Sequence, residues 1–111
     1  MTALAALQTV TDQVDAFNAH DLDAFVATYS EDAVVSGVAE TPLVGREAIR
    51  AFYADRLVNP LLSCTIDATT VFGNRWVVAR EHVANAGIAT ETIATFDVRD
   101  GLIQRASMLK A

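Results

Sequence analysis

The sequence predicts a single α+β domain covering residues 1–111, with helices first and an antiparallel sheet after them. Ahead of Asn59-Pro60, apolar residues recur at three- and four-residue spacing, which is typical of amphipathic helices. Beyond that break the chain is almost continuously strand-like and rich in Val, Ile, Thr and aromatic residues. Helices and strands do not alternate, and no repeat or linker interrupts the chain, so one compact unit is expected.

Two helices are expected before residue 30. The apolar stripe of the first consists of Leu4, Leu7, Val10, Val14 and Phe17. Residues 18–21 interrupt this stripe, and Asp21 can cap a short second helix by accepting from the amides of the next turn. The stripe of the second helix consists of Leu22, Phe25, Val26 and Tyr29.

A short strand and a third helix follow. The strand is expected from Glu31 to Ser36, and Thr41-Pro42 is read as a turn because the residue before proline avoids helical geometry. Gly45 opens the third helix, whose inward residues are Ile49, Phe52, Tyr53 and Leu57.

The back half predicts an antiparallel meander of four strands. Their ranges are Leu61–Phe72, Trp76–Ala84, Ile88–Val98 and Leu102–Leu109. Each separator contains residues suited to a hairpin loop, namely Gly73-Asn74, Asn85-Ala86-Gly87 and Asp100-Gly101.

Composition limits the possible partners. The formal net charge is −6 and the eight basic residues are scattered, so neither nucleic acid nor an anionic membrane is an expected partner. No apolar run approaches the roughly 20 residues that span a bilayer, and the N-terminus lacks the basic segment of a signal peptide. The single cysteine, Cys64, can form no internal disulfide and is read as a small apolar strand residue. A cytoplasmic location is therefore expected.

Two segments of the front half carry a family resemblance. Residues 17–33 read Phe-Asn-Ala-His-Asp-Leu-Asp-Ala-Phe-Val-Ala-Thr-Tyr-Ser-Glu-Asp-Ala, and residues 45–53 read Gly-Arg-Glu-Ala-Ile-Arg-Ala-Phe-Tyr. Together with the strand-rich back half, they resemble nuclear transport factor 2-like proteins, ketosteroid isomerases and SnoaL-like polyketide cyclases. The resemblance implies a cone-shaped fold in which helices and a curved sheet enclose a pocket.

The same resemblance implies that the ketosteroid isomerase acids are missing. Gln13 stands at the position of the tyrosine that helps bind the oxyanion, Gly37 at the position of the general base, and Ala94 at the position of the second acid. Tyr29 and Tyr53 remain as supporting aromatics. Because glycine cannot carry a proton between carbons, isomerisation of Δ5-3-ketosteroids by the usual route is not expected.

The residues that line the cone depend on the register of two strands, and two registers are open. A three-residue loop, Asn85-Ala86-Gly87, pairs Arg80 with Thr92, and we favour it. Five residues then face the cone, namely Trp76, Arg80, His82, Thr92 and Phe96, with the acids Glu81, Glu91 and Asp97 on the opposite face. A two-residue loop would set Glu81 beside Thr92 instead and reverse the faces.

Candidate site residues follow from the favoured register. The catalytic candidates are His82 as proton carrier, Tyr53 as a donor to oxygen, and Glu40 as a displaced base. The candidates for substrate binding are Phe17, Tyr29, Trp76, Arg80, Thr92 and Phe96. The alternative readings are an ordinary hydrogen-bonded sheet histidine for His82 and, for Arg80, the partner of a carboxylate such as Glu40. No second His or Cys stands at ligand spacing, so no metal or other cofactor is expected.

Three function classes remain open at this point. They are an isomerase, cyclase or lyase acting on a small apolar carbonyl compound, a non-catalytic pocket for a small apolar molecule, and a dimeric interaction module whose cone is filled by its own side chains. A homodimer is expected in any of them, because a sheet with helices on one side leaves its other face bare. The residues predicted on that open face are Val77, Ala79, Val83 and Ile93.

Overall fold

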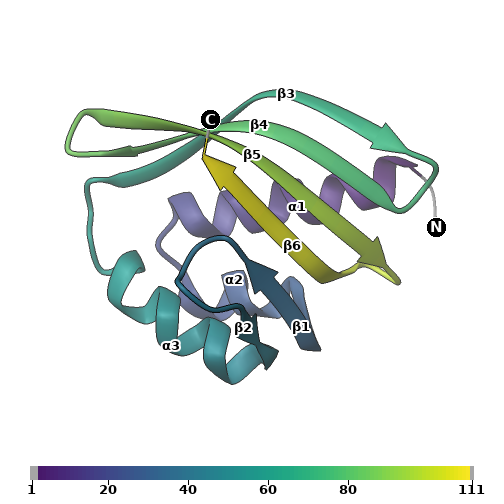
Figure 1. Ribbon diagram of the computed structural model, residues 1–111, viewed down its shortest axis with the longest axis horizontal. Coiled ribbons are helices and arrows are strands. Elements are labelled where there is room, and N and C mark those ends of the chain that lie inside the picture. Colours follow the sequence, from purple (N-terminus) through teal and green to yellow (C-terminus); the bar gives the residue numbers. More distant parts are fainter. Residues whose placement is uncertain (1–2, 111) are drawn as a thin grey trace.

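Three helices and a six-stranded sheet make up the computed structural model, which describes residues 3–110 (Figure 1). The helices are α1 (Ala3–Asn18), α2 (Leu22–Ala27) and α3 (Gly45–Leu57). The strands are β1 (Tyr29–Ser36), β2 (Leu43–Val44), β3 (Leu62–Phe72), β4 (Trp76–Asn85), β5 (Ile88–Arg99) and β6 (Leu102–Lys110). None of the helices in residues 3–110 has the length and apolar character needed to cross a membrane.

The long strands form the predicted meander, and the short ones extend it. The sheet order is β2-β1-β6-β5-β4-β3, with every neighbouring pair antiparallel except β1 and β6, which are parallel. The sequence did not predict β2 or the β1–β6 pairing, since β2 has only two residues and β1 and β6 are far apart in the chain. In Figure 1 the helices lie on one side of the curved sheet, with α1 running across the long strands.

The boundary between α1 and α2 agrees with the sequence. Asp21 has an extended backbone and accepts a hydrogen bond from the Ala24 amide at 3.1 Å, as expected of an N-cap. The last residue of α1, Asn18, is joined to β3 by two hydrogen bonds. Its side-chain amide donates to the Cys64 carbonyl at 2.8 Å and its Oδ1 accepts from the Cys64 amide at 2.7 Å. This pair fixes one wall of the cone against the other.

An aromatic cluster joins the three helices and β1. Phe25 lies at its centre, with ring-centroid distances of 4.5 Å to Tyr53, 5.5 Å to Tyr29 and 6.0 Å to Phe17. Tyr29 was expected on the apolar stripe of the second helix; it is instead the first residue of β1 and is fully buried. Ile49, Tyr53 and Leu57 recur every four residues along α3, and this buried face holds the helix on the cluster.

The favoured register of β4 and β5 is wrong. The loop between them has two residues, Ala86 and Gly87, with φ of 54° and 85°. Two positive φ values are typical of a type I′ turn, whose twist matches that of the flanking strands. Asn85 therefore stays in the sheet opposite Ile88, and Glu81 pairs with Thr92.

Because the loop is one residue shorter than expected, the two faces of β4 are exchanged. Val77, Ala79 and Glu81 point toward the helices and are buried, whereas Arg80 and His82 lie on the outer face. The predicted open face is corrected accordingly. Val77 and Ala79 belong to the core and Val83 faces the cone, so only Ile93 of that set lies on the outer face.

Candidate functional site

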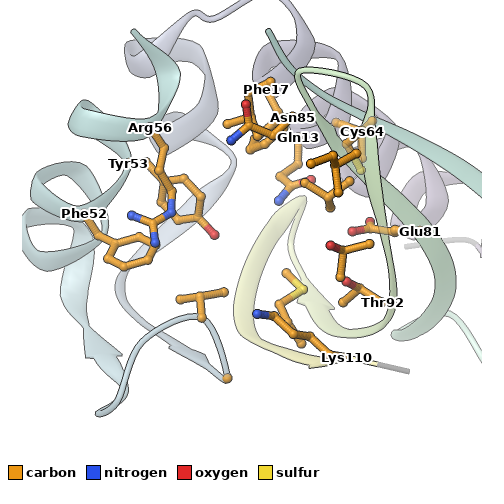
Figure 2. Close-up of a pocket in the computed structure, with 18 residues that line it drawn as sticks. Gln13, Phe17, Phe52, Tyr53, Arg56, Cys64, Glu81, Asn85, Thr92 and Lys110 are labelled. Carbon is orange, nitrogen blue, oxygen red and sulfur yellow. The ribbon is translucent and has the colours of Figure 1, made fainter. Parts of the chain in front are cut away.

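The cone encloses a pocket of about 500 Å³. Helices α1 and α3 form one side of it, and the inner faces of β3 to β6 form the other (Figure 2). Its interior is built from buried side chains, namely Gln13, Tyr53, Cys64, Glu81 and Thr92, with apolar residues between them. Its rim is built from exposed residues, among them Arg56, Asn85, Thr90 and Lys110. The pocket is thus largely apolar, with a few buried polar groups in its interior and others exposed on its rim.

Glu81 is the polar group that stands out in the interior. Only 4% of it is exposed, and its Oε2 has no hydrogen-bond partner among the described residues. Burial raises the pKa of this carboxyl above its ordinary value, and a hydrogen bond with the Cys64 thiol only partly offsets the shift. A buried hydrogen-bonding atom left without a partner costs about 1–3 kcal/mol. A ligand group that bonded to Oε2 would remove that cost.

Tyr53 faces Glu81 from the opposite wall. In Figure 2 its hydroxyl projects from α3 into the pocket, while Glu81 and Thr92 lie on the sheet side. Burial raises the pKa of Tyr53 to about 12; Arg56 opposes this shift and Glu81 adds to it. The hydroxyl therefore stays protonated at neutral pH and can donate a hydrogen bond to a ligand oxygen.

A second tyrosine lies behind the pocket wall. The Gln13 side-chain amide donates to the Tyr29 hydroxyl at 3.1 Å, and burial raises the pKa of Tyr29 well above its usual range. Gln13, and not Tyr29, lines the pocket. This glutamine stands where the resemblance places a tyrosine of the isomerases.

The structure brings together only part of the site that the sequence predicted. Phe17, Tyr53 and Thr92 line the pocket as expected. Phe96, like Tyr29, is buried in the core and is not part of the pocket wall. Glu40 is exposed in the loop between β1 and β2 and does not line the pocket.

The placement of Arg80, His82 and Trp76 inside the cone is wrong. All three lie on the outer face of β4, where Trp76 is 43% exposed. Arg80 pairs with Asp67 and not with Glu40, and His82 Nε2 lies 3.6 Å from the same carboxylate. Asp67 reaches this face because β3 has an irregularity between Ile66 and Ala68. The hydrogen bond from Arg80 lowers the pKa of Asp67.

Glu81 and Cys64 are two buried pocket residues that the sequence did not predict, and the rim cations Arg56 and Lys110 were not predicted either. Glu81 was assigned to the opposite face by the register, and Cys64 was read as an ordinary strand residue. The sequence signal for Glu81 is the loop between β4 and β5. If Ala86-Gly87 is read as a two-residue turn, Glu81 faces the pocket. Within residues 3–110, no group of three His, Cys, Asp or Glu side chains is arranged to hold a metal ion.

Gly37 lies on the rim, beside β6. Its φ is +88°, and a Cβ built on it would lie 2.0 Å from the carbonyl oxygen of Met108. No side chain fits there without movement of the backbone. The position that the resemblance assigns to the isomerase base is therefore closed to any acid in this chain.

Solved structures share this architecture over nearly the whole chain. A nuclear transport factor 2-like protein of unknown function from Burkholderia xenovorans is 15% identical, with coverage of 100% of this chain and 86% of its own and a TM-score of 0.85. A Mycobacterium tuberculosis protein crystallised with estradiol-17β-hemisuccinate is 19% identical, with coverage of 97% and 93% and a TM-score of 0.81. SalBIII, an epoxide hydrolase/cyclase-like enzyme of pyran ring formation in salinomycin, is 16% identical, with coverage of 96% and 90% and a TM-score of 0.84.

At these identities the likenesses establish the fold, which is the α+β nuclear transport factor 2-like cone that the sequence predicted. The family comes from the sequence match. Residues 10–106 match the SnoaL-like domain, which is most of the 111-residue chain. The chain belongs to the SnoaL-like domain family.

Proposed function

We propose that this protein binds a small, largely apolar organic molecule in the cone. The observation that carries the proposal is the pocket of about 500 Å³ between α1, α3 and the sheet. Small-molecule sites are typically about 300–1,000 Å³, with mostly apolar walls and a few polar groups. A cone filled by its own side chains, as an interaction module would have, does not agree with this volume. The steroid ester held by the M. tuberculosis relative supports the proposal by analogy of fold.

A neutral fluorescent ketone tests it. We expect 6-propionyl-2-dimethylaminonaphthalene to bind with a blue shift of its emission, because its apolar rings leave water. Thr92→Phe adds a ring inside the pocket and should abolish this binding. Thr70→Phe makes the same change on the exposed outer face of β3 and is the matched control. Equal binding by both variants would exclude the cone as the site.

A second candidate function, proton transfer, is favoured by the position of Glu81. In its ionised form the Glu81 carboxylate would take a proton from the carbon next to a ligand carbonyl, and the C–H electron pair would form an enolate. The Tyr53 hydroxyl would donate a hydrogen bond to the enolate oxygen. Glu81 would then return the proton to another carbon of the conjugated system. The net change is an isomerisation that needs no cofactor or co-reactant.

The rate at which the protein converts 3-cyclohexenone to 2-cyclohexenone tests the proton-transfer function. We expect Glu81→Gln to lower turnover roughly 10²–10⁴-fold, the usual contribution of a positioned acid–base group. His82→Gln and Glu40→Gln remove the candidates favoured by the sequence and should leave turnover unchanged, since neither residue lines the pocket. If either control loses activity while Glu81→Gln keeps it, the assignment to Glu81 is wrong. Binding without turnover would leave the first candidate alone.

We also propose a homodimer through the outer face of the sheet. Phe72, Trp76 and Leu109 are 56%, 43% and 68% exposed there, although such residues are usually buried. A groove of about 250 Å³ lies next to Trp76 on this face, and side chains of a second copy could fill it. All three helices pack on the other side of the sheet, so this face is open to a second copy.

A further inference from the structure

The acidic group of the pocket lies in its interior, and the basic groups lie on its rim. All fourteen acidic residues lie within residues 3–110, and among them only Glu81, which is buried, lines the pocket. Of the eight basic residues, Arg56 and Lys110 line it, and both are exposed on the rim. A chain with a net charge of −6 therefore has a cationic opening to its apolar pocket.

Neither rim cation forms an ion pair with another side chain of residues 3–110. Four arginines pair with aspartates, and Arg46 donates to backbone carbonyls. Among the described residues, that leaves three basic side chains without a carboxylate or carbonyl partner, namely Arg56, Arg105 and Lys110. Two of these three, Arg56 and Lys110, line the same pocket.

Arg56 is also held in position. Its guanidinium carbon lies 3.7 Å from the centroid of the Phe52 ring, which itself lines the pocket. Stacking on an aromatic face leaves the in-plane N–H groups of a guanidinium free to donate. In Figure 2 this group lies on the α3 side of the pocket, and Lys110 extends from the end of β6.

We propose that the pocket takes a ligand with an apolar body and a single carboxylate, and that Arg56 and Lys110 bind the carboxylate at the rim. This inference rests on the proposed binding function and specifies its ligand class. The buried end must stay uncharged, because an anion beside Glu81 would meet a carboxyl in a site with little water. The carboxylate therefore stays outside and the apolar body enters, with any carbonyl oxygen directed to Tyr53 or Glu81.

A matched pair of probes tests the inference, namely 4-oxo-4-phenylbutanoate and its methyl ester. Both have the same aryl ketone, and they differ only in the charge of one end. We expect the acid to displace the fluorescent ketone at a concentration about tenfold lower than the ester at low salt, since two charge-assisted contacts are added. The preference should shrink as sodium chloride is raised, because exposed charges are screened.

Three variants locate the effect. Arg56→Gln and Lys110→Gln should each reduce the preference for the acid over the ester about threefold. Arg105→Gln removes an unpaired arginine that does not line the pocket and should change neither affinity. Circular dichroism of each variant checks that the fold is retained.

The outcomes separate this inference from the function on which it rests. If the ester binds as tightly as the acid, or if Arg105→Gln removes the preference as the rim variants do, the carboxylate inference is overturned and the apolar pocket stands. If neither probe displaces the fluorescent ketone, the carboxylate inference is overturned, and the proposed binding function is then decided by whether Thr92→Phe abolishes binding of the ketone itself. A preference lost only in the rim variants supports the inference.

Discussion

Glu81 and Thr92 lie directly opposite each other on β4 and β5, and both line the pocket. This pairing places a carboxyl on the same inner surface as the core residues Ala79 and Ala94, which are paired next to it. The environment of Glu81 is thus set by the sheet register and not by a charged neighbour. The principal cause of its raised pKa is accordingly burial.

The pH dependence of stability should reveal this carboxyl. Because its pKa is raised in the folded state, the folded protein binds the proton more tightly than the unfolded chain does. The stabilising contribution of Glu81 is therefore full below its ordinary pKa of 4.5 and is lost as the pH rises through the folded pKa. We expect the unfolding free energy of the wild type, relative to that of Glu81→Gln, to fall over this range in urea titrations. A relative stability that rises with pH would contradict the raised pKa.

The single thiol should be almost inert in the folded protein. Burial raises the pKa of Cys64 from 9.0 to about 12, with Glu81 as a further cause. At pH 8 the thiolate fraction is then about a thousandfold lower than in the unfolded chain, and Ellman's reagent should react more slowly by a similar factor. Glu81→Gln should speed the reaction, and His82→Gln should not. Equal rates for native and urea-unfolded protein would exclude this environment.

Asp97→Asn should be the most costly single loss of charge on the outer side of the sheet. The Asp97 carboxylate is 3% exposed, and it accepts two hydrogen bonds from Arg75, at 2.6 and 3.0 Å, and one from Arg99 at 3.4 Å. We expect a loss of about 1–3 kcal/mol near neutral pH. The hydrogen bond from Arg75 lowers the pKa of Asp97, so this contribution is present above the ordinary pKa of 3.8 and is lost as the pH falls through the folded pKa.

Asp23→Asn is the matched control for that variant. Its partner is Arg50, and the two side chains are 86% and 46% exposed. An exposed pair contributes about 0–1 kcal/mol. Urea unfolding of both variants should therefore separate them clearly, and similar losses would show that burial does not set the strength of the Asp97 pairs.

Association of the protein can be measured by light scattering. We expect a mass near twice the 11.9 kDa of one chain at micromolar concentration. Phe72→Glu and Leu109→Glu should lower it to that of a single chain, because each places a charge on the exposed apolar face. Leu4→Glu changes a leucine that is 78% exposed on α1 and should leave the mass unchanged. A monomeric wild type would exclude the proposed dimer.

Much of the fold was predictable because its boundaries have local signals. Asp21 caps α2 and Gly45 begins α3, and both were predicted from the sequence. The Asp100-Gly101 turn was also expected, and both of its residues have positive φ. The parallel contact of β1 with β6 has no such signal, since it joins segments at opposite ends of the chain.

The pocket residues on β4 were predicted less well because the register of β4 and β5 depends on the backbone conformation of Ala86. Alanine rarely adopts a positive φ, so Ala86 was not expected to take the position that Asp100 holds in the later turn. A loop of three residues instead of two then reversed the faces of β4. Phe17, Tyr53 and Thr92 line the pocket because their faces do not depend on this loop or are the same in both registers. Arg80, His82 and Glu81 lie on the strand whose faces the loop decides.

The close approach of Gly37 to Met108 limits how this protein can be redesigned. A designer who wished to introduce steroid isomerase activity would begin by placing an aspartate at position 37, the position that the resemblance assigns to the general base. The backbone there has a φ of +88° and lies against the Met108 carbonyl, so the substitution would displace β6 at the rim of the pocket. Engineering of new catalysts on this scaffold is therefore better begun from Glu81, on the opposite wall, where the backbone already accepts an acid.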